Sequence, residues 1–153
     1  MKSPDLKIPP LVIMAFVGGL MWLGTRSLPA AGFPMPARQA IALSLAAVGV
    51  GVAVAGVVAF RIAKTTVNPL KPDTASRLVV SGIYHFTRNP MYLGALIVLV
   101  GWAVFLTNTV AFIVAILFVL YLNRFQIIPE EKALTTRFGP EFAAYCAKVR
   151  RWI

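Results

Sequence analysis

The chain has 153 residues, which is room for one domain, 1–153. Hydrophobic residues make up 59% and charged residues 13%, against roughly 25% charged in soluble proteins, so the composition indicates a membrane protein. The net charge is +10, but the basic residues lie between the apolar runs rather than in one tract, which argues against nucleic-acid binding. With one cysteine (Cys146) and one histidine (His85), an internal disulfide and a cysteine-cluster or multi-histidine metal centre are excluded.

Two apolar runs in the first half predict membrane spans at 11–28 and 39–60. The first is short and follows a charged start, so a signal peptide is its alternative interpretation. Against that, Ala15 and Gly19 have the small-xxx-small spacing of packed membrane helices. The second run is dense in glycine and alanine, which predicts a helix packed closely on its neighbours.

The segment 61–89 is predicted to be a long loop. It carries five basic residues against a single acid, Asp73, and two prolines that prevent one continuous helix. A loop of this length in so small a membrane protein is more often functional than a plain connector. Within it, Leu78-Val79-Val80 has two interpretations, lying against the membrane or lining a pocket.

Spans three and four, predicted at 90–107 and 109–125, are joined by a turn too short for anything but a tight hairpin. The two helices must then be antiparallel neighbours. Their polar ends, Arg88-Asn89 and Asn123-Arg124, are therefore expected close together on one membrane face.

The C-terminal segment 129–153 is predicted to be helical and cytoplasmic. Pro129 should open a surface helix that Gly139-Pro140 ends. A last helix then repeats apolar residues every three or four positions, which is typical of an amphipathic helix lying on a bilayer. The expected fold class is all-α, a polytopic membrane protein with about four transmembrane helices and this amphipathic segment.

Lysine and arginine set the expected orientation. With four spans, thirteen of them fall in the N-terminal tail, the 61–89 loop and the C-terminal segment, and only Arg26 and Arg38 fall on the opposite face. The positive-inside rule then places both termini in the cytoplasm, in a bacterial or archaeal plasma membrane.

Arg88, Asn89 and Pro90 stand where the polar loop meets the third apolar run. Asparagine favours the N-cap and proline the first helical position, so a helix should begin at about Met91. Its free N–H groups and Arg88 would form a docking point for an anionic group. The alternative is that Asn-Pro only caps the helix while Arg88 anchors it at the interface.

Glu130 and Glu131 follow span four as closely as Arg88 precedes span three. They could simply complement the dipole of their own helix. The hairpin, however, brings this anionic pair to the cationic Arg88, and a zwitterionic amino-acid moiety would suit both. Only His85, Glu130 and Glu131 are plausible bases nearby.

These residues resemble a known family, the isoprenylcysteine carboxyl methyltransferase and phospholipid methyltransferase group of integral membrane enzymes. The matching elements cover roughly 65–152: Gly82-Ile83-Tyr84, Arg88-Asn89-Pro90-Met91-Tyr92-Leu93-Gly94, Glu130-Glu131, Leu134 and Phe138-Gly139-Pro140-Glu141-Phe142. One departure is Asn89, where the pattern often has histidine; asparagine can donate a hydrogen bond but cannot act as an acid or base.

The resemblance implies a methyltransferase that holds S-adenosylmethionine between two motifs, Arg88–Gly94 and Glu130-Glu131, and methylates a lipophilic acceptor. An isoprenylcysteine-type carboxylate is the favoured acceptor, with a phospholipid amine or a thiol as alternatives. The residues it points to for cofactor binding are Tyr84, Arg88, Asn89, Tyr92, Gly94, Glu130 and Glu131, and those for catalysis are Arg88, Arg124 and Glu130.

Two other classes of function stay open at this point. Sterol-reductase-like membrane enzymes resemble the C-terminal region, but a phosphorylated nicotinamide cofactor needs a larger basic cleft than 153 residues readily provide. A non-catalytic membrane scaffold would use the same charged residues as interface anchors. For the methyltransferase, the acceptor is expected to enter sideways from the bilayer, through a gap near Tyr92, Trp102 and Tyr121.

Overall fold

The computed structural model describes residues 9–64 and 76–153, and this part of the chain contains no β-strand. The long helices are α1 (Pro10–Ser27), α2 (Arg38–Ile62), α3 (Pro90–Leu106), α4 (Thr109–Leu122), α5 (Ile128–Phe138) and α6 (Pro140–Lys148). Short helical turns are η1 (Pro29–Ala31), η3 (Gly82–His85) and the π-helical η4 (Asn123–Ile127). Part of the expected 61–89 loop, with Asp73, lies outside the described residues.

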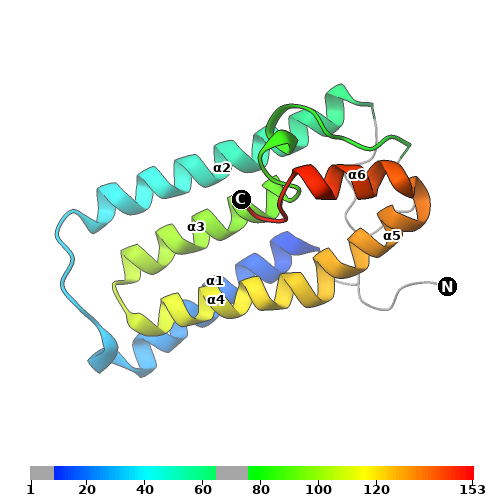
Figure 1. The fold of residues 1–153 in the computed structure, drawn as a ribbon. Helices are drawn as coiled ribbons and strands as arrows, with labels where there is room; N and C mark the ends of the chain where they lie inside the picture. Colours follow the sequence, from blue (N-terminus) through cyan, green and yellow to red (C-terminus); the bar gives the residue numbers. More distant parts are fainter. Residues whose placement is uncertain (1–8, 65–75) are drawn as a thin grey trace.

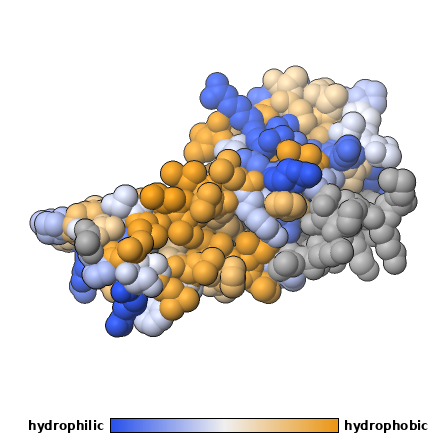
Figure 2. Space-filling model, turned by 90° about the horizontal axis from the view of Figure 1, so that it is seen from below, coloured by the Kyte–Doolittle hydropathy of each residue, from blue (hydrophilic) through white to orange (hydrophobic). Residues whose placement is uncertain are grey.

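Three helical stretches are long and apolar enough to cross a membrane: α1, α2 and the continuous stretch Thr109–Phe138. Helix α3 is a shorter apolar helix. Figure 2 shows hydrophobic side chains gathered over the middle of the helices, with hydrophilic ones at both ends. The expected fold class, an all-α polytopic membrane protein, is confirmed.

Helices α2 and α3 pack closely because glycine lies at their contact. A Cβ on Gly49 would come within 2.6 Å of the carbonyl oxygen of Gly94, and one on Gly101 within 3.0 Å of that of Ala42. By contrast, Gly51 has no atom of the described residues within 4 Å of such a Cβ. The small residues of α2 therefore serve close packing on the face toward α3.

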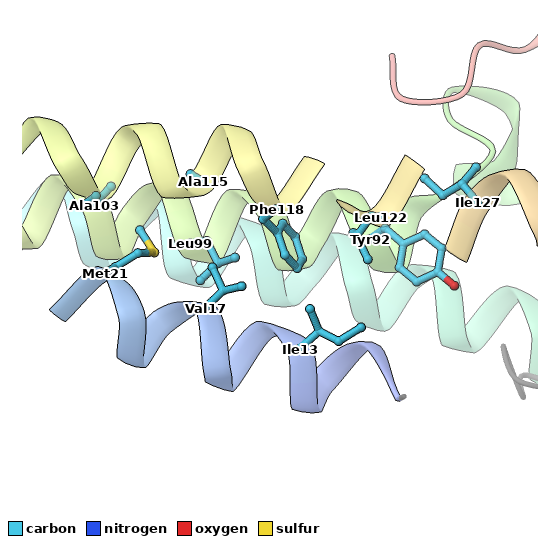
Figure 3. Packing of buried hydrophobic residues seen from close by; sticks show 11 residues of the cluster. Ile13, Val17, Met21, Tyr92, Leu99, Ala103, Ala115, Phe118, Leu122 and Ile127 are labelled. Atoms are coloured by element: carbon cyan, nitrogen blue, oxygen red, sulfur yellow. The ribbon is translucent and has the colours of Figure 1, made fainter. Parts of the chain in front are cut away.

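The main core lies between α1, α3 and α4. Met21, Leu99, Phe118 and Leu122 are almost fully buried, and Figure 3 shows their side chains between the three helices. The indole Nε1 of Trp102 also donates to the carbonyl oxygen of Gly18, at 3.1 Å, which ties α3 to α1.

Helices α3 and α4 form the expected tight hairpin. Thr107 adopts a left-handed conformation, and the side chain of Asn108 caps α4 by accepting a hydrogen bond from the Val110 N–H at 2.9 Å. The hairpin turn lies at one end of the bundle, while α5, α6 and the start of α3 lie at the other (Figure 1). We call this second end the polar end.

The C-terminal segment differs from the expectation in two respects. First, Pro129 does not open a separate helix, because the chain stays helical from α4 through η4 into α5. A π-turn is one way a helix accommodates a residue without an N–H. Second, the apolar side of α6 does not lie on a bilayer: Phe142 and Tyr145 are buried against Val79 and Tyr84. The amphipathic pattern therefore reflects packing on the protein itself.

Candidate active site at the polar end

One carboxylate at the polar end is held by two arginines from distant parts of the chain. A terminal nitrogen of Arg88, just before α3, lies 3.1 Å from Oε1 of Glu131 in α5. Arg151, after α6, donates to the same carboxylate twice, from Nε to Oε1 at 3.1 Å and from Nη2 to Oε2 at 2.6 Å. We call these three residues the charge cluster. Two guanidinium groups and one carboxylate leave it with a net positive charge.

Arg88 is held in place by its backbone as well as by its side chain. Its N–H donates to the carbonyl oxygen of Arg150 at 3.1 Å, and its side chain is only 14% exposed. The Nε atom is buried and makes no hydrogen bond with any of the residues that the structure describes. A buried donor without a partner is costly, so this guanidinium has hydrogen-bonding capacity left for an anionic ligand.

Asn89 occupies the N-cap position of α3, which begins at Pro90. Its side chain does not cap the helix; Nδ2 donates instead to the carbonyl oxygen of Arg151 at 2.9 Å. The Asn89 N–H in turn donates to the hydroxyl of Thr87 at 3.1 Å. Asn89 therefore joins the start of α3 to the C-terminal tail.

Glu130 has a separate partner. Its Oε2 atom accepts a hydrogen bond from the hydroxyl of Tyr92, at 3.0 Å, and Tyr92 is 5% exposed. In Figure 3 the hydroxyl of Tyr92 points out of the apolar cluster, at the end where Ile127 lies. The two adjacent acids thus have different surroundings: Glu131 lies between arginines and Glu130 bonds to a phenol.

The structure therefore brings together Arg88, Asn89, Tyr92, Glu130 and Glu131 of the expected site residues. Two further residues named from the sequence, Gly94 and Arg124, lie in other surroundings, as does the candidate base His85, whereas Tyr84 is within electrostatic reach of Glu130.

Tyr84 is buried in a second apolar cluster with Val79, Phe142 and Tyr145, and its carbonyl oxygen accepts a hydrogen bond from the Tyr145 hydroxyl at 2.7 Å. Burial and the nearby Glu130 carboxylate raise the pKa of the Tyr84 phenol. Gly94 packs on α2, since a Cβ there would collide with the Gly49 carbonyl. Arg124 is exposed, with its guanidinium 5.4 Å from the centre of the Phe125 ring. His85 is exposed, and its Nδ1 lies 2.9 Å from the carbonyl oxygen of Val80.

The C-terminal tail was not expected from the sequence to form part of the site. After α6 ends at Lys148, residues 149–152 return to the start of α3. There Trp152 donates from Nε1 to Oδ1 of Asn123 at 3.1 Å. In the sequence, Arg150-Arg151-Trp152 is equally typical of a segment that lies on a bilayer surface. Only the two adjacent acids, Glu130 and Glu131, indicated that the site has a further basic partner.

An apolar groove runs between α1 and α3 within the apolar part of the bundle. Its volume is about 450 Å³, and it is lined by Met14, Ala15, Gly18, Gly19, Trp22, Val98, Leu99 and Trp102. Trp102 is one of the residues expected near an entry gap, whereas Tyr92 is buried and the Tyr121 ring packs 4.9 Å from that of Phe125.

Fold and site together define an α-helical membrane protein with a charged, partly buried cluster at one end of its helices. The model of the phospholipid methyltransferase family matches residues 37–141, which include both motifs and the α3–α4 hairpin. The chain belongs to the phospholipid methyltransferase family, a family of membrane methyltransferases.

A relative of Haemophilus influenzae, named only as an uncharacterized protein, is 44% identical to the chain over 63 residues. The aligned stretch is 41% of this chain and the whole of that protein. No solved structure matches the chain.

Proposed function

We propose that the protein transfers a methyl group from S-adenosylmethionine to a lipophilic acceptor at the polar end of the bundle. The observation that supports this proposal is that two residues at the start of α3 bond to the two acids of α5: Arg88 to Glu131, and Tyr92 to Glu130. Family membership supplies the reaction class. Two motifs separated by a membrane hairpin supply the charged groups.

The residues present fit the amino-acid end of such a cofactor, which carries a carboxylate and an ammonium group. Arg88 has a buried Nε atom without a partner in the described part of the chain, and an arginine fork matches a carboxylate. Glu130 bonds to Tyr92 and to no arginine of the charge cluster. It can therefore accept a hydrogen bond from the ammonium group of the cofactor. Glu131 is already bound by two arginines.

The bound cofactor would supply an electrophilic methyl group, and the protein has to orient it and match its charge. Arg88 would hold the carboxylate, and Tyr92 orients Glu130 through their hydrogen bond. An amine or thiol acceptor must also lose a proton, and Glu130 is the candidate base at this site. A carboxylate acceptor needs no base. Asn89 cannot take this role, since an amide does not titrate.

The acceptor is proposed to be a lipid that enters from the bilayer, with its tail in the groove between α1 and α3. Val98 of the groove follows Pro90 by eight residues, or about 12 Å along α3 at roughly 1.5 Å per residue. A tail running from the polar end would reach it. Each buried methylene contributes ~0.8 kcal/mol, so the tail would dominate the acceptor's affinity.

We infer that the polar end faces the cytoplasm, where the polar cofactor is available. This inference rests on the distribution of lysine and arginine, with only Arg26 and Arg38 assigned to the opposite face. Both termini would then be cytoplasmic.

Methyl transfer with the purified full chain tests the proposal. Labelled S-adenosylmethionine is offered with two acceptor series, prenylcysteine carboxylates and phosphatidylethanolamines, each with tails of increasing length. We expect transfer to one series and a KM that falls as the tail lengthens. A KM independent of tail length would contradict entry from the bilayer, and no transfer to either series would contradict the proposed acceptors.

A further inference from the structure

We propose that Arg151 is a positioning residue for the amino-acid end of the cofactor, acting through Glu131 and Arg88. This inference rests on the proposed function and extends it to a residue of the C-terminal tail. Arg151 lies outside both motifs and outside the matched residues 37–141.

The geometry of the ion pair is the first support. Arg151 uses two nitrogens on the two oxygens of Glu131, at 3.1 Å and 2.6 Å. Such a fork fixes the plane of the carboxylate, which a single point charge does not. Arg88 meets Oε1 of the same carboxylate at 3.1 Å. The orientation of Glu131, and with it the position of the Arg88 guanidinium, therefore depends on Arg151.

The backbone of the tail is the second support. The carbonyl oxygen of Arg151 accepts from Asn89 Nδ2 at 2.9 Å and lies 3.4 Å from the Thr87 hydroxyl, while the Arg150 carbonyl accepts from the Arg88 N–H. Side chain and backbone of Arg151 thus connect α5 to the start of α3. These are the two elements between which the cofactor is proposed to bind.

The division of charge is the third support. Glu131 lies between Arg88 and Arg151, whereas Glu130 bonds to Tyr92. Without Arg151, Glu131 would face Arg88 alone, and the pair would be neutral rather than positive. The hydrogen bond to Glu131 raises the pKa of Arg151 above its usual value, so the guanidinium stays charged. Arg151 therefore leaves Arg88 free to bind an anion.

Calorimetric titration of two ligands into the detergent-solubilised full chain tests this role. S-adenosylhomocysteine has the amino-acid end; 5′-methylthioadenosine has the same nucleoside and sulfur without it. Arg151→Lys keeps the charge but not the fork. We expect this variant to bind S-adenosylhomocysteine about tenfold more weakly, the usual effect of losing a charged hydrogen bond, and methylthioadenosine as the wild type does. The control is Lys148→Gln, which removes an exposed positive charge at the end of α6.

The outcomes separate the two proposals. Equal affinity of Arg151→Lys and wild type for S-adenosylhomocysteine would overturn the positioning role and leave the proposed function standing. An equal loss of affinity for both ligands would show a general structural defect and would also overturn it. If the wild type binds neither ligand while remaining folded, the proposed function fails, and the positioning role fails with it.

Discussion

Glu130 and Glu131 are adjacent in the sequence, yet they have different surroundings, and we propose different roles for them. Glu131 is neutralised by two arginines, one of them through a fork. Breaking such a partly buried pair leaves unpaired charge behind, so its first role is to hold the site together. Glu130 bonds to a neutral phenol and to no arginine of the charge cluster, so it is the acid that we propose meets the ammonium group of the ligand.

Glu130→Gln should therefore weaken cofactor binding without unfolding the protein. The amide oxygen can still accept the hydrogen bond from Tyr92, but the negative charge is gone. We expect the affinity for S-adenosylhomocysteine to fall about tenfold and the thermal unfolding midpoint to stay the same. The matched control is Glu141→Gln, at an exposed position in the first turn of α6. If both variants bind like the wild type, Glu130 does not contact the ligand.

Tyr145 is a residue whose role is structural. Its hydroxyl donates to the carbonyl oxygen of Tyr84 at 2.7 Å, and burial raises its pKa, so it stays protonated at neutral pH. Tyr145→Phe should lower the free energy of unfolding by about 1 kcal/mol. Denaturant titration in detergent measures this difference.

Burial of the Tyr145 hydroxyl also gives the stability a pH dependence. Because the folded-state pKa of Tyr145 is raised, its contribution is fully present below the unfolded-state pKa of about 10 and is lost as pH rises above it. The stability difference between wild type and Tyr145→Phe should shrink above that pH. A difference that stays constant would show that the pKa of the Tyr145 hydroxyl is the same in the folded and unfolded states.

At the scale of elements, the contact between α2 and α3 depends on glycine. Gly94 was named from its motif as a cofactor-binding residue, and in the structure it packs on Gly49. Gly94→Ala should destabilise the protein by about 1–3 kcal/mol, the usual cost of overpacking. Gly51→Ala is the control, with no described atom within 4 Å, and should be neutral or stabilising. If Gly94→Ala is as stable as the wild type, the helices are not in close contact.

The sequence predicted the helices and the hairpin well because apolar runs and cap residues are local signals. The convergence of Arg88 with Glu130 and Glu131 also followed, since a short turn forces α3 and α4 to be antiparallel. The course of 149–152 could not be predicted, because it depends on which surface buries Phe142 and Tyr145. An amphipathic pattern is the same whether its partner is lipid or protein.

At the scale of the whole molecule, charge asymmetry makes the orientation testable. The test uses a Cys146→Ser background into which one cysteine is introduced at a time. The two variants are Pro36→Cys, before α2, and Thr136→Cys, in α5, which are exposed positions at opposite ends of the bundle. An impermeant maleimide added to intact cells should label position 36 and not position 136. Labelling at 136 alone would show that the polar end faces outward.

The whole molecule also divides into two regions of different chemistry, a charged polar end and an apolar groove farther along α3. The proposed reaction between a polar cofactor and a lipid would use both regions. Helix α3 connects them, since Arg88 precedes its first residue and Trp102 lies near its end.

Binding of S-adenosylhomocysteine to the purified full chain, measured by calorimetry beside NADPH, tests the central claim most directly. We predict binding of S-adenosylhomocysteine by the wild type, at least tenfold weaker binding by Arg88→Lys, and no binding of NADPH. Binding of NADPH without S-adenosylhomocysteine would contradict the account in favour of a reductase, and binding of neither by folded protein would contradict it in favour of a scaffold.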